Sequence, residues 1–216
     1  MNWLAHLALG DVYGDGAGVR GGAGGGGEVL LGSVMADFLR GTDRRVRSGY
    51  PAGVVRGIEL HRRVDSLVDS HALVHRGLGR FGEAHRRVGG IVLDIVFDHF
   101  LTVDWGLLRG VDEDVEGFVR RVEGEIDGVS QWYSPLFAEV WPRMKQEGWL
   151  ASYGSLEGVV LACSRLERRL GERFGRRVDL VGAVSKVECW YAAYWEEFRA
   201  LWGDLSAVGR SGGSQA

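Results

Sequence analysis

Residues 58–71 read Ile58-Glu-Leu-His61-Arg-Arg-Val-Asp65-Ser-Leu-Val-Asp69-Ser-His71, and this stretch decides the fold class. Its apolar residues recur every three or four positions, which is the spacing of an amphipathic helix. On a helix His61 and Asp65 share one face, because residues four apart are neighbours on its surface. The stretch therefore predicts a helix that presents an imidazole beside a carboxylate.

The same periodicity continues through most of the chain, and no stretch alternates in the way that predicts a strand. The expected helices are 2–9, 28–40, 51–76, 83–105, 112–129, 135–153, 155–174 and 178–202. Gly41 suits the end of the second helix, and Pro51 suits the first turn of the third. We predict an all-α fold, a single-domain bundle of about seven or eight helices over residues 1–205.

Glycine dominates residues 14–27, where we expect a flexible loop, and the tail 206–216 is expected to be disordered. The segment Gly16-Ala-Gly-Val-Arg-Gly21 matches a dinucleotide-binding pattern, but it follows no strand, so no dinucleotide site is expected. The chain also lacks paired Glu-x-x-His motifs, a G-x-S-x-G elbow and a Walker loop. The sequence therefore gives no support to a di-iron bundle, a serine hydrolase or a P-loop enzyme.

The composition gives no global sign of a nucleic-acid or membrane partner. The net charge of −3 comes from 26 basic and 29 acidic residues, so an electrostatic partner would need a local patch. Cys163 and Cys189 are too few for a disulfide framework or a cysteine zinc site. Without a signal peptide or a long apolar run, we expect a soluble cytoplasmic protein with no nucleic-acid and no membrane partner. The oligomeric state is not indicated.

Acidic and imidazole side chains recur inside otherwise apolar helical runs. The set comprises Asp37, His61, Asp65, Asp98 and His99. A charged group is costly to bury without hydrogen bonds or a metal ion. His6 alone would more often be a hydrogen-bonded core residue than a ligand, but the company of the other groups favours a metal centre. Mixed imidazole and carboxylate ligands suit Mn, Fe or Zn.

Arginines lie near this predicted centre in the sequence. Arg62 and Arg63 flank His61, and an arginine fork beside a metal ion could clamp a phosphate oxygen. A solvated helix face is the alternative for both. Other arginines could form a basic rim for an acidic partner, or be unlinked surface charge. These are Arg44, Arg45, Arg47, Arg86 and Arg87.

Together these motifs resemble those of the acyl carrier protein phosphodiesterase family, a non-standard branch of the HD-domain phosphohydrolases. The matching segments are Met1-Asn-Trp-Leu-Ala-His6-Leu, Gly32-Ser-Val-Met-Ala-Asp37-Phe-Leu-Arg-Gly41, Val55-Arg-Gly-Ile-Glu-Leu-His61-Arg-Arg-Val-Asp65, Asp69-Ser-His71 and Leu93-Asp-Ile-Val-Phe-Asp98-His99-Phe-Leu101. The sequence departs from the family pattern at Val68 and Ala72, and residues 14–27 look like an insertion. The predicted ligands are intact.

The resemblance implies an HD-domain-like fold and hydrolysis of the phosphodiester that joins a 4'-phosphopantetheine arm to a serine of acyl carrier protein. Mn²⁺ is the expected metal, with Mg²⁺ or Fe²⁺ as alternatives. The expected metal ligands are His6, Asp37, His61, Asp98 and His99. The expected catalytic residues are Arg62, Asp65 and Asp69, with either carboxylate as general base. The expected substrate-binding residues are Arg63, Arg44 and Arg45.

Two alternatives stay open on the residues alone. The first is a metal-dependent phosphohydrolase that acts on a nucleotide or another small phosphoester. The second is a non-catalytic α-helical binding protein, in which the same histidines and aspartates are buried structural groups and no metal is retained.

Overall fold

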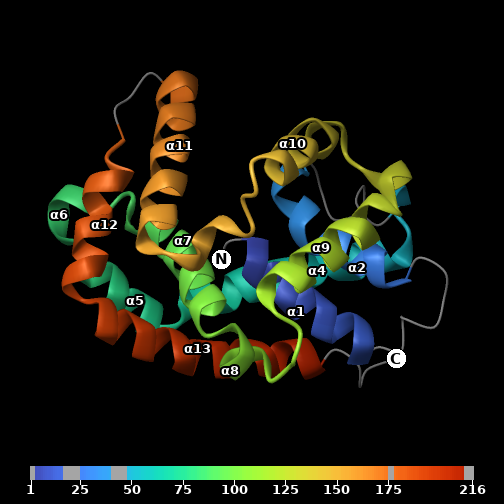
Figure 1. Cartoon of the computed structure of the whole chain (residues 1–216), viewed down its shortest axis with the longest axis horizontal. Coiled ribbons are helices and arrows are strands. Elements are labelled where there is room, and N and C mark those ends of the chain that lie inside the picture. Colours follow the sequence, from blue (N-terminus) through green and yellow to red (C-terminus); the bar gives the residue numbers. More distant parts are fainter. Residues whose placement is uncertain (1–2, 17–24, 40–47, 175–177, 212–216) are drawn as a thin grey trace.

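The computed structural model describes residues 3–16, 25–39, 48–174 and 178–211, and these residues form an all-α fold without a strand (Figure 1). They include twelve α-helices, ten of which have at least seven residues, and three 3₁₀ helices. The all-α prediction is confirmed, whereas the predicted number of helices is too low.

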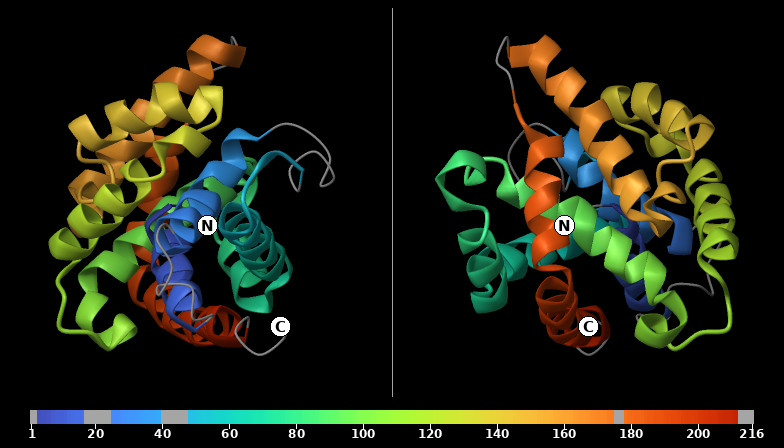
Figure 2. Two further views of the ribbon diagram at one scale, coloured as in Figure 1. Left: turned by 90° about the vertical axis from the view of Figure 1, so that its right-hand side faces the viewer. Right: turned by 60° about the vertical axis from the view of Figure 1, so that its left-hand side comes forward.

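The helices cross one another around one hydrophobic core. The α-helices are α1 (Trp3–Gly16), α2 (Gly25–Met35), α4 (Ala52–Ser70), α5 (Ala72–Gly79), α6 (Gly82–His85), α7 (Gly89–Val103), α8 (Trp105–Arg109), α9 (Val115–Asp127), α10 (Pro135–Gln146), α11 (Leu156–Phe174), α12 (Leu180–Cys189) and α13 (Tyr191–Ser211). The 3₁₀ helices are η2 (Ala36–Phe38), η3 (Ser130–Trp132) and η4 (Ser152–Gly154). In Figures 1 and 2, α13 lies along one edge of the molecule and α11 projects at the opposite side.

Several predicted helices divide where the backbone leaves the helical conformation. His71 is extended (φ −75°, ψ 130°) and ends α4. Its Nδ1 accepts a hydrogen bond from the Leu73 amide at 3.3 Å and so caps α5. The predicted helix 178–202 also divides, at Trp190, whose backbone is neither helical nor extended (φ −122°, ψ 20°). Periodicity alone misses these breaks, because the apolar pattern continues across them.

Helix extends into two segments that we expected to be irregular. α1 continues to Gly16 and α2 begins at Gly25, so helix enters the predicted loop 14–27 from both sides. Residues 17–24, in the middle of that loop, lie outside the described residues. α13 continues past the predicted boundary to Ser211, and Leu205 is fully buried on it. Packing of that apolar side chain supports the longer helix.

Helices α2 and α4 cross at two glycines. A Cβ atom on Gly32 would lie 2.2 Å from the carbonyl oxygen of Val54, and one on Gly57 would lie 2.2 Å from that of Val29. The two backbones are therefore in direct contact, which only glycine permits at these positions. This close crossing brings the backbone of α2 within reach of the side chains on α4.

Helix α1 lies in the interior, with residues 4–11 buried. Its Asp11 carboxylate is 2.8 Å from Nη2 of Arg109 and 2.9 Å from Nη1 of Arg121. These ion pairs tie α1 to α8 and α9, and the pairing offsets the desolvation of the buried charge. Among the described helices, none is long and apolar enough to cross a membrane.

We expect Gly57→Ala to lower the free energy of unfolding by about 2–3 kcal/mol, because the new methyl group would force two helix backbones apart. Gly124→Ala is the matched control, since Gly124 is exposed within α9 and a Cβ there meets nothing within 4 Å. The control should be neutral or stabilise by up to about 1 kcal/mol. Urea unfolding measures both, and equal effects of the two variants would contradict the close crossing.

Candidate metal centre

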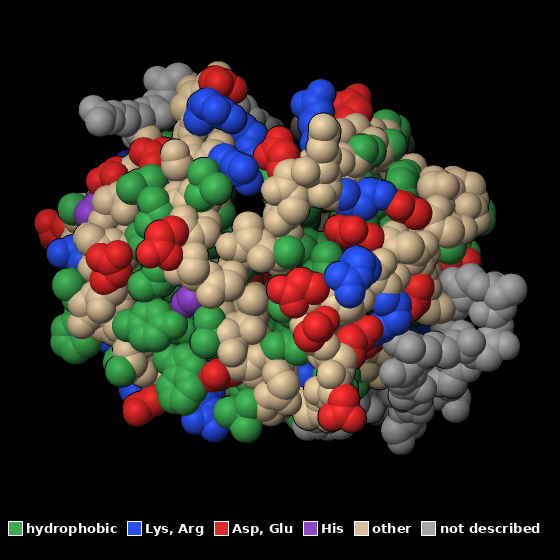
Figure 3. Space-filling model, viewed as in Figure 1, with side chains coloured by type: hydrophobic (Ala, Val, Ile, Leu, Met, Phe, Trp, Pro, Cys, Tyr) green, Lys and Arg blue, Asp and Glu red, His purple; other side chains and the backbone are tan. Residues whose placement is uncertain are grey.

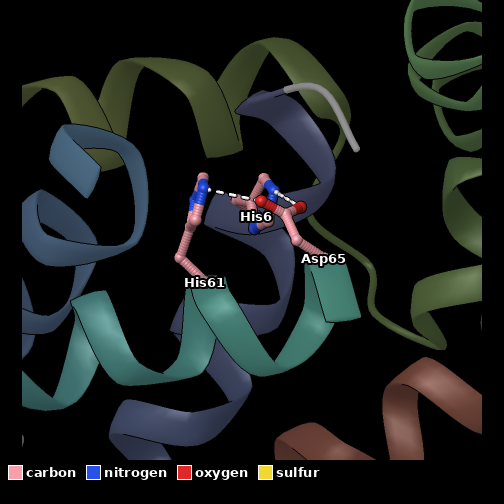
Figure 4. A group of neighbouring side chains, drawn as sticks. All are labelled: His6, His61 and Asp65. Atoms are coloured by element: carbon pink, nitrogen blue, oxygen red, sulfur yellow. Dashed lines mark ion pairs between the residues drawn. The ribbon is translucent and has the colours of Figure 1, made fainter. Parts of the chain in front are cut away.

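His6 on α1 meets His61 and Asp65 on α4 in one cluster (Figure 4). Nε2 of His61 is 3.0 Å from Oδ2 of Asp65, and Nε2 of His6 is 3.2 Å from Oδ1 of the same carboxylate. One ligand atom from each residue lies within 4.8 Å of the other two. The helical spacing of His61 and Asp65 therefore places an imidazole beside a carboxylate, as predicted, and α1 supplies a second imidazole.

The two imidazole rings stack, with centroids 3.9 Å apart and planes at 18°. His6 is 1% exposed and His61 is 4% exposed. Burial lowers the pKa of His6 to about 4, against the pull of the neighbouring Asp65 carboxylate. At neutral pH His6 is therefore an uncharged imidazole, which is the form that binds metals.

Within the described part of the chain, neither ring nitrogen of His6 has a hydrogen-bond partner, although both are buried. The approach of its Nε2 to Asp65 is an ion-pair distance without hydrogen-bond geometry. A buried, unsatisfied imidazole is unfavourable unless something else binds it. A metal ion would satisfy one of its nitrogens, so the cluster fits the cation that the sequence predicts.

The orientation of His61 is set from its far side. Its Nδ1–H donates to the carbonyl oxygen of Ser33 at 2.8 Å, which leaves Nε2 facing the carboxylates. Burial alone would lower the pKa of His61, but hydrogen bonds with Asp37 and Asp65 outweigh burial and raise it to about 9. The same contacts lower the pKa of both carboxylates below its ordinary value, despite their partial burial. Two ionised carboxylates thus stabilise a positive charge at Nε2 of His61, and a bound cation would supply that charge in place of the proton.

Asp37 lies in η2, which follows α2 directly. Its Oδ1 is 3.3 Å from Nε2 of His61, and its Oδ2 accepts a hydrogen bond from Nε1 of Trp3 at 3.0 Å. The side chain is 48% exposed, compared with 36% for Asp65. Asp37 therefore borders the cluster on the side that solvent can reach.

Asp98 and His99 have their polar atoms engaged elsewhere. The two Asp98 oxygens accept hydrogen bonds from the backbone amides of Leu4 and Ala5 at 2.9 and 3.0 Å. Asp98 is fully buried, and burial raises its pKa to about 7 against the effect of these amides. The carboxylate thus caps the first turn of α1 from α7.

The ring of His99 lies between η4 and α13. Its Nδ1 is 2.7 Å from the carbonyl oxygen of Tyr153, and its Nε2 is 2.9 Å from the hydroxyl of Tyr191. Both nitrogens therefore have partners. The structure does not bring Asp98 or His99 into the group of His6, His61 and Asp65, because adjacent residues on α7 face different neighbours.

The other predicted residues lie around α4 or outside the described residues. Asp69, Arg62 and Arg63 are exposed on α4. Asp94, on α7, is half-buried, and burial together with the nearby charges of Asp65 and Asp69 raises its pKa. The basic-rim residues Arg44, Arg45 and Arg47 fall in residues 40–47, of which the structure says nothing.

A cavity of about 360 Å³ opens next to Asp37 and Trp3. Its walls come from η2, α7, α10, η4 and α11, and they include Trp149, Arg165 and Arg169. Figure 3 shows this face hollowed between α10 and α11, with basic side chains on the α11 side. The sequence alone does not indicate these arginines, because a basic residue on an amphipathic helix usually lies on its solvated face.

We expect Asp98→Ala to lower the free energy of unfolding of the metal-free protein by about 1–3 kcal/mol, because it leaves two buried amides without acceptors. Asp69→Ala removes an exposed carboxylate from α4 and should change stability by less than about 0.5 kcal/mol. Chemical denaturation in the presence of a chelator measures both. An Asp98→Ala protein as stable as wild type would remove the capping role.

Wild-type protein should retain close to one Mn²⁺ or Zn²⁺ per chain after dialysis, because three ligand atoms converge on a buried site. We expect His61→Ala to weaken binding by at least about 100-fold. His75→Ala, at an exposed histidine of α5, is the matched control and should bind as wild type does. Elemental analysis and calorimetry provide the measurement, and equal binding by the two variants would rule out the cluster as the site.

Comparison with known proteins supplies the family. The family described as acyl carrier protein phosphodiesterase matches residues 1–205. Relatives named acyl carrier protein phosphodiesterase include one from Photorhabdus laumondii, 32% identical over 90% of this chain and 87% of its own. Another, from Yersinia enterocolitica, is 33% identical over 94% of each chain. A third, from Serratia proteamaculans, is 34% identical over 87% of this chain and 86% of its own.

No solved structure matches the chain. The HD-domain-like relationship therefore stays a prediction, and the family assignment depends on sequence. Because the family match spans nearly the whole chain, this protein belongs to the acyl carrier protein phosphodiesterase family.

Proposed function

We propose that this protein is a metal-dependent phosphodiesterase that hydrolyses the bond between acyl carrier protein and its 4'-phosphopantetheine arm. The observation that carries the proposal is the buried group of His6, His61 and Asp65, in a chain whose relatives are named for this activity. The products would be the apo carrier protein and free 4'-phosphopantetheine.

His6, His61 and Asp65 would hold the divalent cation, with Mn²⁺ as the expected ion. When bound, such an ion acts as a Lewis acid toward the phosphodiester and activates water near neutral pH. In this assignment Asp65 is a ligand rather than the general base. The support for it is the geometry, since its two oxygens face the two imidazoles.

Asp37 is better placed than Asp65 or Asp69 to act as the general base. It is ionised at neutral pH because contacts with His61 and Trp3 lower its pKa, and it is half exposed beside the cavity. In the reaction, water forms a bond to phosphorus and gives one proton to Asp37. The bond from phosphorus to the carrier serine oxygen breaks, and that oxygen takes up the proton that Asp37 received.

Asp69, one of the two carboxylates predicted as the general base, and Arg62, the predicted clamp, are exposed on α4. We keep Arg62 as the proposed clamp on a phosphoryl oxygen, because it lies on α4, the helix that carries His61 and Asp65, and a guanidinium fork matches a phosphate. Asp69 is the alternative base. Arg63, with Arg44 and Arg45, stays proposed as contacts for the carrier protein.

With Mn²⁺ present, the protein should convert holo-acyl carrier protein to the apo form, seen by mass spectrometry as loss of the phosphopantetheine mass. Asp37→Asn should slow this reaction by at least about 100-fold, as expected for loss of a general base, and should retain the metal. Asp69→Asn is the matched variant, and its rate should stay near that of wild type.

The result can separate the alternatives. If Asp69→Asn is slow and Asp37→Asn is not, the base is Asp69. If the metal-loaded protein hydrolyses small phosphoesters and leaves the carrier protein intact, the general phosphohydrolase is correct. Retention of no metal and no hydrolysis of either substrate would favour a binding protein.

A further inference from the structure

We infer that the cavity between α10 and α11 binds the pantetheine portion of the substrate while its phosphate lies at the cluster. This inference rests on the proposed function, since it names the part of the substrate that the cavity would take. The cavity volume of about 360 Å³ is within the usual range of small-molecule sites, roughly 300–1,000 Å³.

The cavity adjoins the candidate metal centre. Asp37 links the two, because it lines the cavity and its Oδ1 is 3.3 Å from Nε2 of His61. Trp3 also lines the cavity and donates its indole hydrogen bond to Asp37. A substrate with its phosphate beside His61 would therefore extend directly past Trp3 into the hollow.

The walls suit an uncharged chain with branched methyl groups and amides. Phe38, Val140 and Leu166 are apolar, and they would contact the methyl groups of a pantetheine chain. Trp3 and Trp149 stack on each other with centroids 6.2 Å apart and planes at 26°. A planar base cannot enter between rings at this spacing, so the pair forms a wall rather than a slot for a nucleotide.

Arg165 and Arg169 supply the polar contacts of this wall. They lie one turn apart on α11, and both line the cavity. The guanidinium of Arg169 lies 4.2 Å from the centre of the Trp149 ring, and Trp149 donates its indole N–H to Glu147 at 2.9 Å. The guanidinium thus lies over the ring, as in a cation–π pair. Guanidinium N–H groups directed at the cavity would donate to the amide carbonyls of the chain.

Binding of free pantetheine to metal-free protein tests this inference separately from hydrolysis, because pantetheine has no phosphate and needs no metal. We expect saturable binding by wild type, measured by calorimetry and by shifts of the indole N–H signals in NMR. Ala162→Phe would place a ring in the cavity, and Val140→Phe would do so from the opposite wall. Each should weaken pantetheine binding by at least about ten-fold.

Matched controls lie on the same helices. Leu161→Phe on α11 and Leu136→Phe on α10 add the same ring at positions 48% and 43% exposed, and both should bind pantetheine as wild type does. Arg169→Ala should weaken binding, whereas Arg168→Ala, at an exposed arginine that does not line the cavity, should not.

The inference is overturned if both cavity-filling variants fold and bind pantetheine as tightly as wild type. It is also overturned if a nucleoside monophosphate binds in a way that Ala162→Phe blocks while pantetheine does not bind. Pantetheine binding without hydrolysis of the holo carrier protein would support the cavity assignment and contradict the proposed function. Hydrolysis of the holo carrier protein with an unchanged KM in both cavity-filling variants would support the proposed function and contradict the cavity assignment.

Discussion

The contact between Gly32 of α2 and Gly57 of α4 is the constraint on which the candidate metal centre depends. Because neither position carries a side chain, the two helix backbones meet directly. The carbonyl oxygen of Ser33, next to Gly32, then lies 2.8 Å from Nδ1 of His61, one turn beyond Gly57. That hydrogen bond turns Nε2 toward the carboxylates. The end of α2 also leads straight into η2, so the same crossing places Asp37 beside His61.

Four aspartates differ in burial, and the difference separates carboxylates that stabilise the fold from carboxylates that a ligand can reach. Asp11 and Asp98 are 6% and 0% exposed, and each has partners that offset its desolvation: two arginines for Asp11 and two backbone amides for Asp98. Both hold α1 in place, and α1 carries His6. Asp65 and Asp37 are 36% and 48% exposed. Only carboxylates that solvent and substrate can reach are able to exchange protons or contact a ligand, so the proposed metal ligand Asp65 and the proposed base Asp37 come from this second pair.

The two sides of Asp37 differ, and this difference suits a long substrate. On one side of Asp37 lie the imidazoles, and on the other side lies a hollow with an aromatic and arginine wall. Arg165 and Arg169 come from α11, at least 100 residues after the candidate metal ligands on α4. Phosphate chemistry and recognition of the rest of the substrate would therefore be supplied by different parts of the chain, connected through Trp3 and Asp37.

The sequence by itself determined the all-α class and the pairing of His61 with Asp65, because both follow from the 3.6-residue period of a helix. It also determined the family, since the motifs around His6, Asp37 and His61 are local in sequence. The predicted number of helices was wrong, because the breaks at His71 and Trp190 depend on the backbone conformation of single residues. Only the tertiary structure decided where the remaining polar groups point. Asp98 and His99 are adjacent in an apolar run and looked like ligands, yet one caps α1 and the other bonds to Tyr153 and Tyr191. The cavity wall on α11 could not be predicted from the sequence for the same physical reason. Long-range packing sets which neighbour a helix face contacts, and a local sequence pattern does not contain that information.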